Sequence, residues 1–312
     1  MIRIGTRGSA LALRQAELVR QAIEQCDKSV RTEIVTIRTK GDRILDVPLT
    51  DFGGKGAFVE EFEQALLDKS IDVAVHSAKD MPMELAGGLA ISAVLKREDA
   101  RDVLLTRRGE DLSGRDKICI GTSSLRRQEQ IKRLLPAECE TLRGNVTTRI
   151  EKLKAGQYDG ILLAAAGLWR LTLTEDETLD YRFLSFDEMI PAGGQGIIAI
   201  EARSTDEKLK MLLASVNDGK AMRELQIERY MLRALDAGCH EPIGVLSQVE
   251  ELQTHIRLFT ARDQVFAGDI VGRTDAWQQL ADELIAKSRS EKGQNGKISV
   301  QRCSDEKRSA GQ

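Results

Sequence analysis

The chain has 312 residues, with 46 Lys and Arg against 49 Asp and Glu, so its formal net charge at pH 7 is −3. This balance argues against a dedicated nucleic-acid-binding protein, which is normally basic, and an aromatic content of 4% leaves few rings for base stacking. With 41% hydrophobic and 30% charged residues, the composition is that of an ordinary globular protein, and the length predicts roughly two or three domains.

The first part of the chain predicts an α/β unit. In chain order we expect a strand over 2–5, a helix over 9–26 with Ser9 as N-cap, a strand over 32–38, a long glycine-containing loop over 39–56, a helix over 57–67 and a buried strand over 71–75. Short apolar strands that alternate with helices of 3.6-residue periodicity are typical of parallel sheets.

The same pattern recurs downstream. Residues 118–122 resemble 2–6, residues 141–143 resemble 36–38, and residues 159–164 resemble 72–77, at offsets of 116, 105 and 87 residues. A second copy with a shorter first helix and no glycine-rich loop explains why the offsets shrink. Chance similarity of short apolar strings is the alternative, because each string alone is an ordinary strand signal.

A third region follows a possible return to the first unit. The segment PAGGQG precedes an apolar run at 197–200, which could add a strand to the first sheet. Beyond it we expect a small α+β domain: a helix from Asp218 capped by Gly238, strands over 243–249, 255–261 and 264–272, and a helix over 275–287. The expected domains are 1–98 with 193–215, then 99–192, then 216–287, followed by a polar, disordered tail over 288–312.

The five cysteines predict neither a disulfide framework nor a metal site. Their number is odd, and they form no Cys-x-x-Cys pair and have no histidine at zinc-ligand spacing. The N-terminus has no secretory pattern, and no stretch approaches the roughly 20 apolar residues of a membrane span. We therefore expect a cytoplasmic protein with reduced thiols that does not engage a membrane.

Basic and hydroxyl side chains follow the predicted strands. In parallel α/β sheets, ligands bind beyond the carboxyl ends of the strands, where helix N-termini also point. Each such residue alone is usually a solvated surface charge, but together they predict a cleft between two domains that binds an extended polyanion. These residues are Arg7, Ser9, Lys79, Asp80, Ser123, Ser124, Arg126, Arg127, Arg143 and Arg149.

Three residues, one of them from this set, could carry chemistry. Asp80 is the one acid of the strand-end set and suits stabilising a cation or relaying a proton, with a simple ion pair as the alternative. His76 could be a general base, although a buried core histidine is favoured. Cys239 follows a helix C-terminus, whose negative end raises a thiol pKa, so it suits a single reaction with a strong electrophile or the role of a small buried hydrophobe.

Eight strings, in order along the chain to about residue 287, closely resemble the porphobilinogen deaminase (hydroxymethylbilane synthase) family. They are IRIGTRGSALAL, GGKGAFVEEFE, DVAVHSAKDMP, REDARD, GTSSLRRQ, LRGNVTTR, PAGGQG and AGCHEPIG. The resemblance implies two similar doubly wound domains, of the type II periplasmic-binding-protein kind, around a cleft, and a small C-terminal α+β domain. It also implies a monomeric transferase that condenses four porphobilinogen molecules head to tail, releasing ammonia, in tetrapyrrole biosynthesis.

The resemblance further implies a cofactor and residue roles. The cofactor is a dipyrromethane built from substrate and held by a thioether to Cys239, and Asp80 matches the catalytic aspartate. Lys79, Ser124, Arg126, Arg127 and Arg149 would bind the carboxylates of the cofactor, and Arg7, Ser9, Arg143 and Arg170 the incoming substrate and growing chain. Lys55 would belong to a lid loop and Gln195 to an interdomain hinge.

One position of the lid departs from the family, because Asp51 stands where a lysine often precedes GGKG. This departure puts a lid contact to substrate in doubt. A non-catalytic, two-domain binding protein for small polycarboxylates is the alternative function. It would explain the arginines but leave Asp80 and Cys239 without a role.

Overall fold

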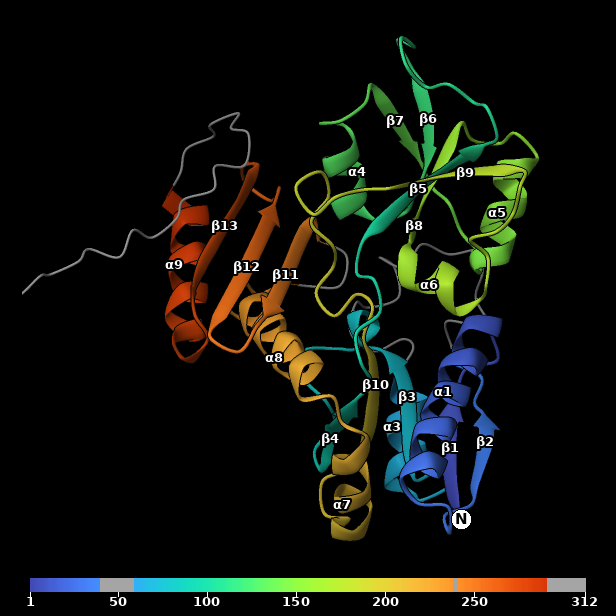
Figure 1. The fold of residues 1–312 in the computed structure, drawn as a ribbon, viewed down its shortest axis with the longest axis vertical. Coiled ribbons are helices and arrows are strands. Elements are labelled where there is room, and N and C mark those ends of the chain that lie inside the picture. Colours follow the sequence, from blue (N-terminus) through green and yellow to red (C-terminus); the bar gives the residue numbers. More distant parts are fainter. Residues whose placement is uncertain (40–58, 238–240, 291–312) are drawn as a thin grey trace, which may run out of the picture.

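Three β-sheets organise the described part of the chain, which comprises residues 1–39, 59–237 and 241–290 of a computed structural model. In Figure 1 the first sheet and its helices lie at the bottom, the second at the top and the third at the left. The chain crosses from the first sheet to the second and back before it enters the third. Among the helices of these residues, none has the length and apolar character needed to span a membrane.

The first sheet has the strand order β2-β1-β3-β10-β4, in which β10 runs antiparallel to both of its neighbours. Its elements are β1 (Ile2–Thr6), α1 (Ala10–Cys26), β2 (Thr32–Thr36), α3 (Glu60–Leu67), β3 (Val73–Ser77), β4 (Leu89–Val94), β10 (Ile198–Arg203) and α7 (Glu207–Val216). The apolar side chains of α1 and the sheet, among them Ile4, Val19 and Ile200, are fully buried together. The predicted return of the chain to this sheet is confirmed, because β10 lies between β3 and β4.

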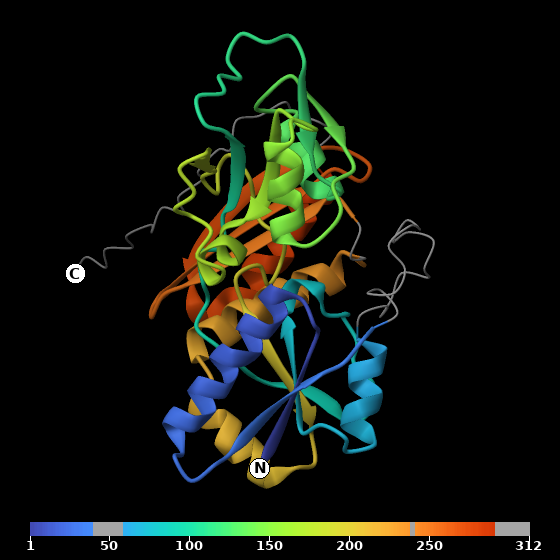
Figure 2. The ribbon, with the colours of Figure 1, turned by 90° about the vertical axis from the view of Figure 1, so that its right-hand side faces the viewer.

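The second sheet has the order β7-β6-β8-β5-β9, with β5 antiparallel to both of its neighbours. Its elements are β5 (Asp102–Arg107), β6 (Ile118–Gly121), α4 (Leu125–Ile131), β7 (Ala137–Glu140), α5 (Val146–Lys154), β8 (Gly160–Ala164), α6 (Ala165–Arg170) and β9 (Leu179–Phe183). Figure 2 shows this sheet above the first, with α6 at its lower edge.

The strand registers confirm the predicted repeat. Gly5 of β1 pairs with Val35 and Ala74, and Gly121 of β6 pairs with Glu140 and Ile161. The three positions in the second sheet follow those in the first by 116, 105 and 87 residues, which are the offsets found in the sequence. The two units therefore share one strand order and one pairing register.

The third sheet, β11-β12-β13, is antiparallel and covered on one face by two helices. Its region contains α8 (Gly219–Ala234), β11 (Ile243–Val249), β12 (Gln253–Thr260), β13 (Phe266–Arg273), η3 (Thr274–Ala276) and α9 (Trp277–Ser290). Its other face packs on Ala100, Phe186 and Ile190 from the segments that connect the first two sheets. The third region is thus fixed to the connections between the other two.

Several predicted boundaries were wrong. The second strand ends at Thr36 and the buried strand occupies Val73–Ser77, two residues later than expected. Helix α8 ends at Ala234, before the expected cap at Gly238, because Asp236 takes the left-handed conformation (φ 48°) that short polar side chains tolerate. Helix α9 continues to Ser290, where a disordered tail was expected from residue 288, and Ser288 is buried with its hydroxyl donating to the Ile285 carbonyl.

Candidate functional site

Asp80 ends a single 3-10 turn, η2 (Ala78–Asp80), directly after β3. The Ala78 N–H donates to the Ile197 carbonyl at 3.0 Å, which ties the turn to the segment entering β10. Gly194 (φ 77°) lies against the turn so closely that a Cβ there would be 3.0 Å from the Ala78 carbonyl carbon and the Lys79 nitrogen. The segment between β9 and β10, which we call the return connection, therefore packs against the turn, and Asp80 is left exposed.

Helix α4 of the second domain begins with three of the predicted site residues. Ser124 is its N-cap and accepts a hydrogen bond from the Arg127 N–H. Arg126 and Arg127 are only 4% and 7% exposed. Burial to this degree requires a counter-charge, because an isolated guanidinium in a protein interior is very costly.

Asp102, the first residue of β5, supplies that counter-charge. Its fully buried carboxylate accepts from Arg126 at 2.7 Å, from Arg127 at 2.7 and 3.0 Å, and from Gln195 at 3.1 Å. Gln195 also donates to the Ala100 carbonyl at 2.7 Å. These contacts hold the pKa of Asp102 well below its usual range: burial opposes ionisation, but the two guanidinium groups outweigh it.

Asp102 is not among the acids expected from the sequence. The sequence predicts Asp80 as the one acid among these cations, although Asp102 ends the string REDARD that resembles the family. The available signal was an acid at the start of an apolar strand. If the strand is buried, the acid is buried with it and requires cations nearby.

Lys79 and Arg149 both interact electrostatically with the buried Arg127. Burial and the nearby Arg127 and Arg126 lower the pKa of Lys79 to about 8, although Asp80 and Asp102 counteract them. Burial and Arg127 lower the pKa of Arg149, on α5, to about 10, while Asp80 raises it. We call Lys79, Asp80, Arg126, Arg127, Arg149 and Asp102 the strand-end cluster. It holds four cations and two carboxylates, an excess of two positive charges.

Arg170, at the end of α6, lies at the connections between the first two domains. It donates to the Gly196 carbonyl at 2.6 Å, and burial lowers its pKa to about 10 in spite of nearby Glu98. The Glu98 N–H donates to the same carbonyl at 3.1 Å. The two connections and α6 therefore meet at Gly196.

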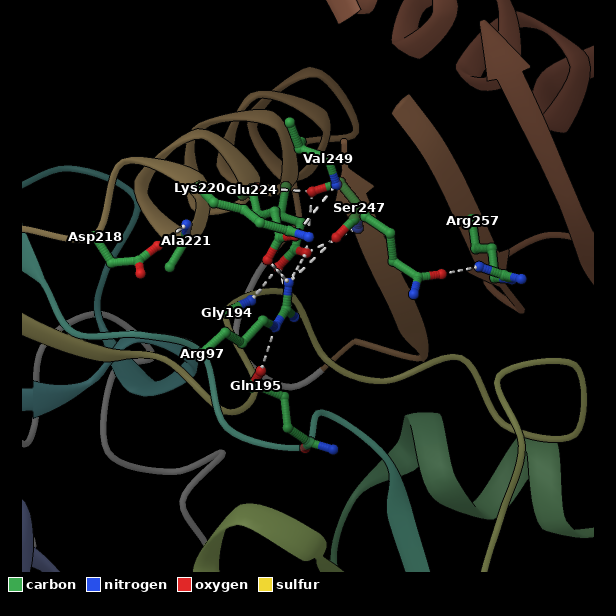
Figure 3. A network of polar contacts seen from close by, with 12 residues as sticks. Arg97, Gly194, Gln195, Asp218, Lys220, Ala221, Glu224, Ser247, Val249 and Arg257 are labelled. Atoms are coloured by element: carbon green, nitrogen blue, oxygen red, sulfur yellow. Dashed lines mark hydrogen bonds and ion pairs between the residues drawn. The ribbon is translucent and has the colours of Figure 1, made fainter. Parts of the chain in front are cut away.

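Helix α8 of the third domain fixes these connections, as Figure 3 shows. Arg97 donates to Glu228 at 2.6 Å and to the Gln195 carbonyl at 3.0 Å, and the Gly194 N–H donates to Glu228 at 2.6 Å. Glu228 is fully buried and also accepts from the Ser247 N–H of β11. The Glu228 carboxylate thus joins three parts of the molecule. They are the segment between β4 and β5, which we call the outgoing connection, the return connection and the third sheet.

The remaining predicted residues are placed less centrally. Ser9 caps α1 by accepting from the Ala12 N–H at 3.3 Å, and Arg7 lies between β1 and that cap. Arg143 follows β7, and its carbonyl accepts from Lys152 at 3.3 Å. Helix α1 contacts α6, so the start of α1 approaches the second domain.

Of the two roles predicted for His76, general base and buried core histidine, its surroundings favour the second. It is 9% exposed, lies 2.9 Å from Glu201 of β10 and meets Phe62 edge to face at 5.2 Å. Such a buried histidine with a carboxylate partner has the character of a core residue. Cys239, Lys55 and Asp51 lie outside the described residues, as do the expected lid loop and most of the expected tail. In the described ranges, no group of three His, Cys, Asp or Glu could hold a metal ion.

Comparison with known proteins gives one consistent family. Residues 2–211 match the family model described as "Porphobilinogen deaminase, dipyromethane cofactor binding domain". The chain is 47% identical over 250 residues to porphobilinogen deaminase of Exiguobacterium sibiricum, covering 80% of each chain. It is 48% identical over 250 residues to that of Syntrophobacter fumaroxidans, covering 78% of this chain and 79% of the relative.

A solved structure is similar at a lower level. The periplasmic VFT2 domain of Bordetella pertussis BvgS has 15% sequence identity and a TM-score of 0.40, with 69% of this chain and 86% of that chain covered. The family assignment depends on the family model and the curated relatives, whose matches include the segments that form both walls of the strand-end cluster. The chain therefore belongs to the porphobilinogen deaminase family.

Proposed function

We propose that the strand-end cluster performs the reaction of the family, in which a transferase joins four porphobilinogen molecules head to tail, with release of ammonia, to form hydroxymethylbilane. The observation that carries this assignment is the excess of two positive charges in a largely buried setting. The lowered pKa values of Lys79 and Arg149 fit this excess, because burial lowers both, neighbouring guanidinium groups lower them further, and Asp80 compensates only in part. An anionic ligand supplies the negative charge that the cluster lacks.

The dipyrromethane cofactor fits this cluster. Each of its two pyrroles carries an acetate and a propionate, and guanidinium groups bind carboxylates through paired hydrogen bonds. When bound, it supplies the pyrrole end to which the first substrate is joined. The residues that hold its carboxylates are Lys79, Ser124, Arg126, Arg127 and Arg149. Cys239 anchors it through a thioether.

Asp102 prepares two of these cations. By taking bonds from Arg126 and Arg127, it fixes both guanidinium groups before the ligand arrives, so less conformational entropy is lost on binding. The cluster keeps its net positive charge because one carboxylate faces two guanidiniums. Gln195 adds a third bond to Asp102 from the return connection, which links the position of that connection to the anion site.

Asp80 is the catalytic group. Loss of ammonia from porphobilinogen breaks a carbon–nitrogen bond and leaves positive charge spread over the pyrrole, with a proton on its nitrogen. An exposed carboxylate among cations stabilises that charge, accepts a hydrogen bond from the pyrrole N–H and helps to move protons. The support for this role is its exposed position at the end of η2 and its effect on the pKa of both Lys79 and Arg149.

The incoming substrate and the lengthening chain are bound by Arg7, Ser9, Arg143 and Arg170. Lys55 belongs to a lid over the site. The domain limits that go with these roles are 1–98 with 193–215, then 99–192, then 216–287. We further propose that the protein acts as a cytoplasmic monomer. The described free cysteines, Cys26, Cys119 and Cys139, fit a reducing compartment. Size-exclusion chromatography with light scattering tests the monomer.

A matched pair of arginine variants tests the cation assignment. Arg149 donates to the Gly144 carbonyl, and Arg108, an exposed arginine on the same domain, donates to the Glu177 carbonyl. We expect Arg149→Gln to slow formation of the cofactor adduct and to lower turnover at least tenfold, while Arg108→Gln leaves both unchanged. Equal behaviour of the two variants would refute the assignment.

Asp80→Asn tests the catalytic assignment. We expect the variant to keep the thermal unfolding midpoint and to lose most turnover, because an amide cannot stabilise a cation or take up a proton. The cofactor adduct must be quantified in the same preparation, so that lost turnover is not confused with lost cofactor. Near-normal turnover in the loaded variant would remove Asp80 from the reaction.

A further inference from the structure

Trp169 is an exposed aromatic residue that is nevertheless held in a fixed position. It is 44% exposed at the end of α6, directly before Arg170. Its ring stacks on Phe183 of β9, with centroids 5.9 Å apart and planes 23° from parallel. Offset stacking of this kind fixes the ring plane, although one face remains open to solvent.

A second group of contacts ties this stack to the outgoing connection. Arg101 lies over the same Phe183 ring at 4.9 Å, and its guanidinium donates to Asp99 at 2.7 and 3.0 Å. Burial raises the pKa of Asp99, but the guanidinium of Arg101 and the nearby Trp169 side chain outweigh it and lower that pKa. The Trp169–Phe183 stack, Arg101 over Phe183 and the Arg101–Asp99 pair form one group of contacts, which we call the Trp169 ring.

The Trp169 ring matters because of its neighbours along the chain. Asp99 and Arg101 belong to the segment between β4 and β5, which is the outgoing connection between the first two domains. Arg170 donates to Gly196, which belongs to the return connection. Two adjacent residues at the end of α6 therefore hold the two connections: Trp169 the outgoing connection and Arg170 the return connection.

From this arrangement we infer that Trp169 is a positioning residue: it holds the end of α6 to the outgoing connection and thereby keeps the Arg170 guanidinium in its place. The inference rests on the proposed function, in which Arg170 binds substrate carboxylates. The start of α6 is held independently, because the Ala165 N–H donates to the Arg101 carbonyl at 3.0 Å; without the Trp169 ring, the end of the helix would be attached to the connections through Arg170. A guanidinium that must hold the fold is less available to substrate. Trp169 thus leaves Arg170 available for the ligand.

Steady-state kinetics of Trp169→Ala tests this role. We expect KM for porphobilinogen to rise about three- to tenfold, which is the effect of weakening one charged contact, with kcat nearly unchanged. Trp169→Phe keeps a stacked ring but loses the indole N–H, so it should recover part of the loss. Trp277→Phe is the matched control, because Trp277 also packs on an aromatic ring, Tyr230, but lies in the third domain.

The outcomes separate positioning from simple stability. A purely structural role predicts a lower unfolding midpoint for Trp169→Ala with an unchanged KM, and that result overturns the inference. If Trp169→Ala does not fold, Trp169→Phe and Asp99→Ala decide, because the first removes the indole N–H beside Asp99 and the second removes the carboxylate that pairs with Arg101. An unchanged KM in both would overturn it. Turnover and cofactor loading of the native protein report on the proposed function separately, so an unchanged KM counts against the positioning role alone.

Discussion

Replacing Asp102 by Asn removes the one carboxylate that joins Arg126 and Arg127. Asparagine has nearly the same shape, so packing is preserved and the change is electrostatic. The fully buried site would then hold two guanidinium groups within hydrogen-bond reach of a neutral amide, with Lys79 and Arg149 nearby. The charge excess of the strand-end cluster would rise from two to three.

The expected cost is large because the surviving charges are buried. Removing one partner of a buried ion pair costs about 3–5 kcal/mol, since the other partner remains desolvated. A loss of that size lowers the folding equilibrium constant by a factor on the order of 10² to 10³ or more, at about 1.4 kcal/mol per factor of ten. Because the pKa of Asp102 is lowered in the folded protein, its contribution is complete at pH 7 and is lost only as the pH falls below about 4.

Equilibrium urea unfolding of the native protein and the variant at pH 7, followed by fluorescence, measures this cost. Asp275→Asn is the control, because Asp275 pairs with Arg273 at 2.6 Å but both side chains are mostly exposed. We expect Asp275→Asn to change stability little, as exposed pairs do. If Asp102→Asn changes stability no more than the control does, the reasoning about buried charge in the strand-end cluster is wrong.

Two further predictions concern the η2 turn that carries Lys79 and Asp80. Because the pKa of Lys79 is lowered to about 8, its ammonium loses its proton as the pH rises through that value, so adduct formation by cofactor-free protein should slow above pH 8. Lys79→Arg should abolish that decline, and a decline in both proteins would contradict the assignment. Gly194→Ala should destabilise the protein by about 1–3 kcal/mol and lower turnover, because φ is 77° and the new Cβ would press on the turn before Asp80. Gly87→Ala, with no atom within 4 Å of its Cβ, is the control, and equal effects on unfolding would refute the strain.

Much of the fold could be predicted from the sequence because both domains use the same local rules. The offsets of 116, 105 and 87 residues fixed the correspondence of strands, and the register pairs Gly5 and Gly121 with matching neighbours. Periodicity and cap residues located the helices, including Ser9 at the start of α1. Strand ends were less accurate, because Ser77 continues β3 through pairing with β10, a partner more than 100 residues away.

The site could be predicted only in part. The strings that follow each strand identified Lys79, Asp80, Arg126, Arg127 and Arg149, and these residues meet in the structure. Composition and spacing do not reveal which charges are buried, however. For that reason Asp102 was missed, although it contacts both arginines of α4.

The contacts that hold the connections between the first two sheets were missed for the same kind of reason. Arg97 meets Glu228 across 131 residues of sequence, and their pairing depends on how the third domain packs on the connections. No local pattern distinguishes such a pair from two solvated surface charges. Only the tertiary arrangement shows that Glu228 is fully buried.

The mass of the intact protein shows whether Cys239 carries the cofactor. We expect the native chain, purified from cells that make porphobilinogen, to be heavier than its sequence by one dipyrromethane unit, and Cys239→Ser to have the unmodified mass. Cys26→Ser, at an exposed thiol on α1, should keep the added mass. A folded, unmodified native protein without deaminase activity, or an adduct that persists in Cys239→Ser, would contradict the account.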